Sequence, residues 1–169
     1  MLPLILKTIY FFLPAAFANM APVLFKNINF LNKPINKRLF GSHKTYRGFF
    51  FGIILAIALS FIQLLLNNFN FSIIQYTATN FLLFGFLLGF GAMLGDLAKS
   101  FFKRRIGIKP GKSLILFDQL DWIIGAIILT FPIINYSLIQ ILSLLVIYGS
   151  LHPLINLLGY ILKIKRNKF

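Results

Sequence analysis

The chain has 169 residues, of which 59% are hydrophobic and only 12% are charged, and 17 Lys and Arg residues stand against three acidic ones. Soluble domains carry about 25% charged residues, and a water-soluble fold of this length could not cover so much apolar surface. The composition therefore excludes an ordinary soluble domain and indicates a membrane protein. Because the chain has no cysteine, it also excludes disulfides and thiolate metal sites.

Five apolar segments follow one another along the chain, each close to the roughly 20 residues that a membrane-spanning helix needs. We predict spans at about residues 2–25, 48–66, 73–94, 114–134 and 138–162. The first run has no convincing small-residue cleavage site, so we expect a retained span and not a signal peptide. The pattern predicts an all-α, polytopic membrane protein that forms a single domain over residues 1–169.

Basic residues gather in alternate connections between these segments. Sixteen of the seventeen Lys and Arg residues lie in residues 26–47, 99–112 and 163–168, with Lys7 as the exception. The connections at 67–72 and 135–137 carry no charge. Since basic residues in short loops mark the cytoplasmic side, we predict an outer N-terminus, two basic cytoplasmic loops and a cytoplasmic C-terminus in the cell membrane.

The three acidic residues, Asp96, Asp118 and Asp121, lie within one stretch of 26 positions. A carboxylate at the centre of a membrane helix costs about 2.5 to 3.5 kcal/mol, so its presence usually has a functional reason. Asp118 and Asp121 are spaced i, i+3 and share a helix face, while Asp96 ends the third span. We therefore expect the three to meet where spans three and four emerge.

Two interpretations of this carboxylate cluster stay open from the residues alone. The simpler one is salt bridging to the nearby basic triplet Lys103, Arg104 and Arg105. The functional one is a divalent metal, most naturally Mg²⁺, held by hard oxygen ligands and shared with substrate phosphates, whose charge nearby cations would neutralise. A metal, cations and a membrane interface together indicate phosphoryl or nucleotidyl transfer on a lipid.

Two motif blocks carry a family resemblance. The first is Gly41-Ser-His-Lys-Thr-Tyr-Arg-Gly48, and the second is Gly95-Asp-Leu-Ala-Lys-Ser-Phe-Phe-Lys-Arg-Arg-Ile-Gly-Ile-Lys-Pro-Gly111 followed by Phe117-Asp-Gln-Leu-Asp121. With Ala18-Asn-Met-Ala-Pro22, they resemble the CDP-archaeol synthase family, which is related to the phosphatidate cytidylyltransferases. One departure is Ser42-His43, where many archaeal members have Asp-Gly before the Lys-Thr pair.

The resemblance implies a CTP-dependent cytidylyltransferase that converts a membrane lipid phosphate, of the archaetidic or phosphatidic acid type, to a CDP-lipid with Mg²⁺ as cofactor. It assigns the metal to the three aspartates, and it groups Lys99 with them as catalytic. The substrate-binding residues that it implies are Asn19, Lys44, Thr45, Arg47, Ser100, Lys103 and Arg104. The expected partners are CTP and the lipid, with no nucleic acid, and a homodimer is possible.

Other membrane proteins fit the sequence less well. A CDP-alcohol phosphotransferase would need a Gly after its first Asp pair and further aspartates downstream, but Trp122 follows Asp121 and no acidic residue comes later. A lipid phosphatase of the histidine type would need a Ser-Gly-His segment, which is absent. From a different class, a small transporter or a basic lipid-binding scaffold remains the alternative, although charged groups lie in loops and not in mid-span.

Overall fold

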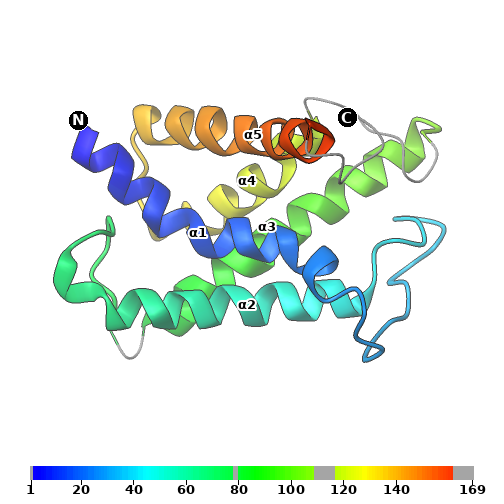
Figure 1. Ribbon diagram of the computed structural model, residues 1–169, viewed down its shortest axis with the longest axis horizontal. Coiled ribbons are helices and arrows are strands. Elements are labelled where there is room, and N and C mark those ends of the chain that lie inside the picture. The colour runs from blue at the N-terminus through cyan, green and yellow to red at the C-terminus, as the bar shows by residue number, and fades with distance from the viewer. Residues whose placement is uncertain (1, 78–79, 109–116, 162–169) are drawn as a thin grey trace.

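The computed structural model describes residues 2–77, 80–108 and 117–161, and these residues form helices and loops with one isolated β-bridge. Their α-helices are α1 (Leu2–Leu24), α2 (Tyr46–Leu65), α3 (Asn80–Arg105), α4 (Phe117–Thr130) and α5 (Leu138–Ile161), with a 3-10 turn, η1, at Asn67–Phe69. Figure 1 shows α1, α3 and α4 lying between α2 and α5. The predicted all-α class is confirmed.

Three of the described helices are long and apolar enough to cross a membrane, namely α1 (from Pro3), α2 and α3. Helix α4 has 14 residues. At about 1.5 Å per residue it measures roughly 21 Å, which is less than the roughly 30 Å of a bilayer's hydrocarbon core. The helices lie close to the predicted segments, but the count of five spans stays a prediction.

Helix α3 begins at Asn80, seven residues later than the predicted third span. Side-chain hydrogen bonds explain the later start. Asn67 pairs with Tyr76 through both its amide nitrogen and its amide oxygen, which holds residues 67–76 as a loop. Asn80 Oδ1 then accepts a hydrogen bond from the Thr77 amide at 2.7 Å, and Thr77 Oγ1 accepts one from the Asn80 amide at 3.2 Å. This reciprocal pair is a helix cap of the kind that satisfies free amides at a helix start.

The other end of α3 continues through Arg105, so the first part of the predicted basic loop is helical. Asp96, Lys99 and Lys103 follow one another at intervals of three and four residues, and they therefore share one face of α3. Each makes an ion pair there, which offsets the cost of placing charge on this buried face. Lys109, Pro110, Gly111 and Lys112 lie outside the described residues.

Glycines let α3 and α4 approach each other at backbone distance. A Cβ atom added at Gly95 would lie only 2.1 Å from the carbonyl oxygen of Asp121, and one added at Gly125 would lie 2.3 Å from the carbonyl oxygen of Gly91. Small residues at a helix crossing allow such close packing in membranes. The crossing therefore sets the distance between the aspartate of α3 and those of α4. Around it lies a buried apolar core that includes Phe11, Phe12, Leu88, Trp122, Ile123 and Leu144.

Candidate active site

Lys99 lies at the centre of a cluster of alternating charges. Its Nζ is 3.1 Å from Asp96 Oδ1, 2.8 Å from Asp121 Oδ2 and 3.6 Å from Asp118 Oδ1. The side chains are largely shielded, since Lys99 is 15% exposed and Asp121 only 6%. The three aspartates thus converge where α3 and α4 meet, and a single ammonium group links them.

Two more lysines complete this cluster, which we call the Asp–Lys cluster (Lys44, Asp96, Lys99, Lys103, Asp118 and Asp121). Lys103 Nζ lies 3.0 Å from both carboxylate oxygens of Asp118, and Lys44 Nζ forms an ion pair with Asp96 Oδ2. Within the cluster three positive charges balance three negative charges. Such pairing is needed because an unpaired charge shielded from water is very costly.

Lys44 enters the cluster from the loop before α2, and that loop is held in place by backbone and side-chain contacts. The Ile35 amide donates to the Lys44 carbonyl at 2.8 Å, next to the bridge between Pro34 and Thr45. Arg47 is buried and its Nη1 donates to the Ile28 carbonyl at 2.7 Å. These contacts tie both ends of the loop to α2, so that Lys44 reaches Asp96 across 52 positions of sequence.

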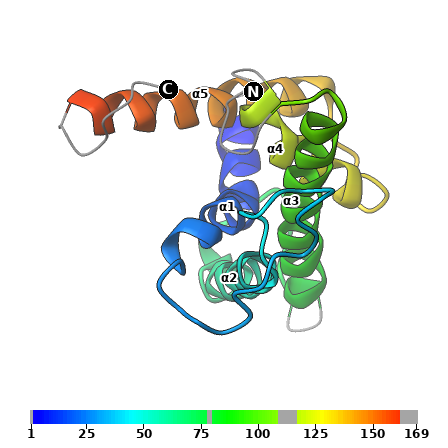
Figure 2. The same ribbon diagram turned by 90° about the vertical axis from the view of Figure 1, so that its right-hand side faces the viewer.

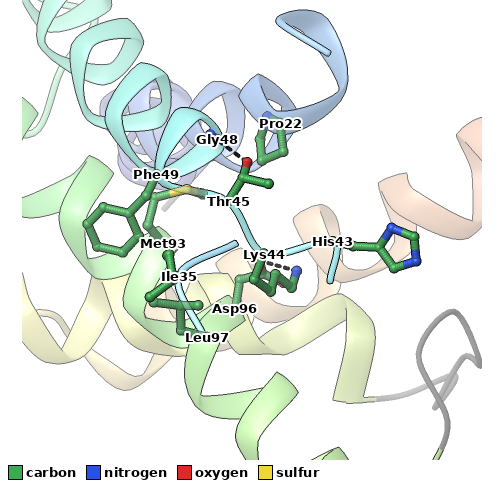
Figure 3. Close-up of a pocket in the computed structure, with 10 residues that line it drawn as sticks. All are labelled: Pro22, Ile35, His43, Lys44, Thr45, Gly48, Phe49, Met93, Asp96 and Leu97. Atoms are coloured by element: carbon green, nitrogen blue, oxygen red, sulfur yellow. Dashed lines mark hydrogen bonds and ion pairs between the residues drawn. The ribbon is translucent and has the colours of Figure 1, made fainter. Parts of the chain in front are cut away.

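A small cavity of about 30 Å³ opens beside the pair of Lys44 and Asp96 (Figure 3). In this view the His43 imidazole points away from Asp96, while Lys44 turns toward it. Apart from these three residues the cavity is lined by Pro22, Ile35, Thr45, Gly48, Phe49, Met93 and Leu97. Apolar walls with a few charged groups at one side are the lining of small-molecule sites, although the cavity is smaller than the roughly 300 to 1,000 Å³ of such sites.

Other predicted substrate-binding residues already have structural partners. Thr45 caps α2, with its Oγ1 accepting a hydrogen bond from the Gly48 amide. Ser100 is buried and its Oγ donates to the Asp96 carbonyl at 2.8 Å. Arg47 makes the contact with Ile28 described above. Their roles toward a substrate stay predictions, and the structure gives each of them a role in the fold.

Two further predicted residues, Asn19 and Arg104, lie near the site. Asn19 is half-buried on α1, one helical turn before Pro22 of the cavity wall. Arg104 follows Lys103 on α3, and its Nε is buried without a hydrogen-bond partner among the described residues. Sequence reasoning did not select the apolar wall residues Phe49, Met93 and Leu97, because apolar residues in apolar segments give no distinguishing signal.

The cluster supplies oxygen donors of the kind that a hard divalent cation binds. Its carboxylate oxygens converge on one point, which the Lys99 ammonium now holds, and Asp121 Oδ1 is buried without a hydrogen-bond partner among the described residues. Within residues 2–77, 80–108 and 117–161, however, no three acidic or histidine side chains are close enough together to bind a metal as they stand. Carboxylate oxygens are the kind of ligand that Mg²⁺ prefers, but the lysines occupy the space between them, and the magnesium site stays a prediction.

Helices of membrane-spanning length and a shielded, charge-balanced cluster beside a cavity are compatible with an intramembrane enzyme, and the comparisons with known proteins identify this class. The sequence matches the CarS-like CDP-archaeol synthase family over residues 1–169. The chain therefore belongs to the CDP-archaeol synthase family and is a membrane-embedded cytidylyltransferase. This membership confirms the predicted resemblance and decides against the transporter and scaffold alternatives.

Individual relatives agree with this assignment over most of their length. The chain is 34% identical to the CDP-archaeol synthase of Methanocaldococcus jannaschii, covering 96% of both chains. It is 35% identical to that of Methanosarcina barkeri, covering 77% of this chain and 82% of the relative. A solved structure described as an intramembrane enzyme for archaeal membrane lipids biosynthesis superimposes with a TM-score of 0.76 at 26% identity, covering 90% of this chain and 94% of the other.

Proposed function

We propose that this protein transfers the cytidylyl group of CTP to an archaetidic acid type of lipid phosphate, releasing pyrophosphate and leaving a CDP-lipid. The observation that carries the proposal is the Asp–Lys cluster, in which three lysines and three aspartates alternate beside a cavity. Relatives that align with 77% and 96% of the chain are named CDP-archaeol synthase, and they support the ether-lipid acceptor over phosphatidic acid.

The proposed reaction asks for positioning and charge neutralisation more than for proton transfer. An oxygen of the lipid phosphate monoester would attack the α-phosphorus of CTP, and the bond from this phosphorus to the pyrophosphate oxygen would break. Because the second pKa of a phosphate monoester is about 6, the attacking oxygen is already anionic at neutral pH. No side chain has to act as general base.

The lysines of the cluster are suited to hold the phosphates. Lys44 comes from a loop and Lys103 from the end of α3, so they approach the aspartates from different elements. When phosphates enter, each lysine could exchange its carboxylate partner for a phosphate oxygen without leaving a buried charge unpaired. The aspartates Asp96, Asp118 and Asp121 would then hold Mg²⁺, which supplies charge neutralisation at the triphosphate when bound.

The test is turnover of the purified chain in detergent with radiolabelled CTP, Mg²⁺ and either archaetidic acid or phosphatidic acid. We expect a lipid-soluble labelled product that disappears with EDTA and forms faster with archaetidic acid. The variants Asp118→Asn and Asp121→Asn should insert and fold, yet lose at least about 100-fold in turnover, the scale of losing one electrostatic stabiliser.

Three outcomes would contradict parts of this proposal. Full activity in both aspartate variants would contradict the metal assignment, and product formation that resists EDTA would contradict Mg²⁺. If folded protein gave no product from either lipid, the proposed acceptor would be wrong.

A further inference from the structure

A second cavity lies at the opposite end of α1 from the Asp–Lys cluster. It has a volume of about 280 Å³ and is lined by Pro3, Leu6, Lys7, Tyr10, Asn70 and Phe71. Lys7 precedes Pro22, which borders the first cavity, by fifteen residues, so the two cavities are about 22 Å apart along the helix. Figure 1 shows this end of α1 beside the η1 loop, away from the loop that carries Lys44.

Lys7 is a cation that has no acidic side chain left to pair with. The chain has only three acidic side chains, and all of them are engaged with Lys44, Lys99 and Lys103 at the other end. Yet Lys7 lies inside the apolar run Pro3–Leu24 and is only partly exposed. A cation placed in an apolar span requires an anion or water nearby, so the partner of Lys7 must come from outside the described chain.

The polar groups around this cavity are arranged as donors. The Tyr10 hydroxyl is buried and has no hydrogen-bond partner among the described residues. The Asn70 Oδ1 accepts a hydrogen bond from Gln75 Nε2 at 2.7 Å, which fixes the amide and leaves its nitrogen as a donor. An ammonium, a phenol and an amide nitrogen together favour an anion with several acceptor oxygens.

The remaining walls are apolar and point to the kind of anion. Leu6 and Phe71 are more than half exposed, and Phe71 stacks on Phe69 with ring centroids 5.6 Å apart. Such walls suit a hydrocarbon chain next to a charged headgroup. A second copy of this chain is disfavoured as occupant, because its three carboxylates are already paired.

We propose that the cavity formed by α1 and the η1 loop binds the phosphate headgroup of an anionic membrane lipid, with Lys7 as counter-ion and the Tyr10 hydroxyl as hydrogen-bond donor. This site is separate from the site for the lipid substrate. It would hold a structural lipid of the leaflet opposite the Asp–Lys cluster.

The test is native mass spectrometry of the delipidated full-length protein, titrated with phosphatidylglycerol and, for comparison, with zwitterionic phosphatidylcholine. We expect one tightly held phosphatidylglycerol, and for Lys7→Gln and for Tyr10→Phe an affinity about tenfold or more lower, as expected for losing a hydrogen bond to a charged group. Lys7→Arg should retain the lipid. Lys26→Gln, which removes an exposed cation at the other end, is the matched control and should bind as the unmodified protein does.

Three outcomes would overturn the proposal. If Lys7→Gln bound phosphatidylglycerol as tightly as the unmodified protein does, Lys7 would not be the counter-ion. If Lys7→Gln lost affinity for phosphatidylglycerol while Tyr10→Phe kept it, Lys7 would be a lysine that extends to the charged membrane surface and not part of a headgroup site. Displacement of phosphatidylglycerol by excess inorganic phosphate would show a site for free anions. Turnover of CTP should be unchanged in all of these variants, which separates this site from the proposed reaction.

Discussion

At the residue level, the Lys99 ammonium helps to neutralise the three aspartates, as a metal ion at the same place would do. Its ammonium lies within 3.6 Å of an oxygen from each aspartate. Without a cation, three carboxylates held this close would repel one another, and protons would bind to relieve the repulsion. Lys99 therefore keeps the site assembled before any substrate is bound, while Lys44 and Lys103 each neutralise one aspartate at its outer side.

We predict that Lys99→Gln destabilises the folded protein by about 3 kcal/mol, because removing one partner of a shielded ion pair leaves charge uncompensated. Thermal unfolding in detergent measures the effect. If the aspartates bind Mg²⁺, added Mg²⁺ should raise the melting temperature of Lys99→Gln more than that of the unmodified protein. An unchanged melting temperature in the variant without Mg²⁺ would show that the ion pairs contribute nothing, and Lys26→Gln serves as the exposed-lysine control.

At the level of helices, the crossing of α3 and α4 determines the site geometry. Gly91 and Gly95 are spaced i, i+4, so they lie on the same face of α3, the face that packs against α4. Gly125 is the glycine of α4 that contacts them. Because the contact is between backbones, the helices cannot separate or rotate without moving Asp121 relative to Lys99. The ion pairs and the glycine crossing therefore support the same arrangement.

Gly95→Ala is the direct test of this crossing. The new methyl group would lie 2.1 Å from the Asp121 carbonyl oxygen, so α4 must move, and we expect a loss of stability of about 1 to 3 kcal/mol, typical of overpacking, together with a large loss of turnover. Gly149→Ala is the matched control, since its methyl would meet only the end of the Leu120 side chain at 2.9 Å. Equal stability and turnover in both variants would contradict a geometric role for the crossing.

The sequence predicted the elements that carry a strong local signal. The long apolar runs identify α1 and α2 to within two residues at each end, and the scarcity of acidic residues identifies the aspartates that converge. The predicted start of α3 is wrong because the mostly apolar residues 73–76 continue the hydrophobic run, while the amide side chains of Asn67 and Asn80 fix them as a loop. The ion pair of Lys44 with Asp96 depends on tertiary packing and has no local pattern.

For the whole molecule, the unequal charge of the two ends bears on its orientation. Lys44, Lys99 and Lys103 lie with the basic loop 26–47 at one end, while Lys7 is the basic residue at the other end among those that the structure describes. From the positive-inside rule we predict that the first end faces the cytoplasm. Helix α4 has only 14 residues, so the side of the membrane on which the turn after it lies shows whether this helix crosses the bilayer. The homodimer stays a separate prediction.

Single cysteines can settle both questions, since the chain has none of its own. We predict that Asn68→Cys and Asn135→Cys, at exposed positions in the two uncharged connections, react in intact cells with a membrane-impermeant maleimide. Ser42→Cys, which is exposed in the basic loop, should react only after permeabilisation. Labelling of Ser42→Cys in intact cells would invert the orientation. If Asn68→Cys were labelled but Asn135→Cys were not, α4 would fail to cross, and the fourth predicted span would be wrong even though the Asp–Lys cluster stays at the cytoplasmic end.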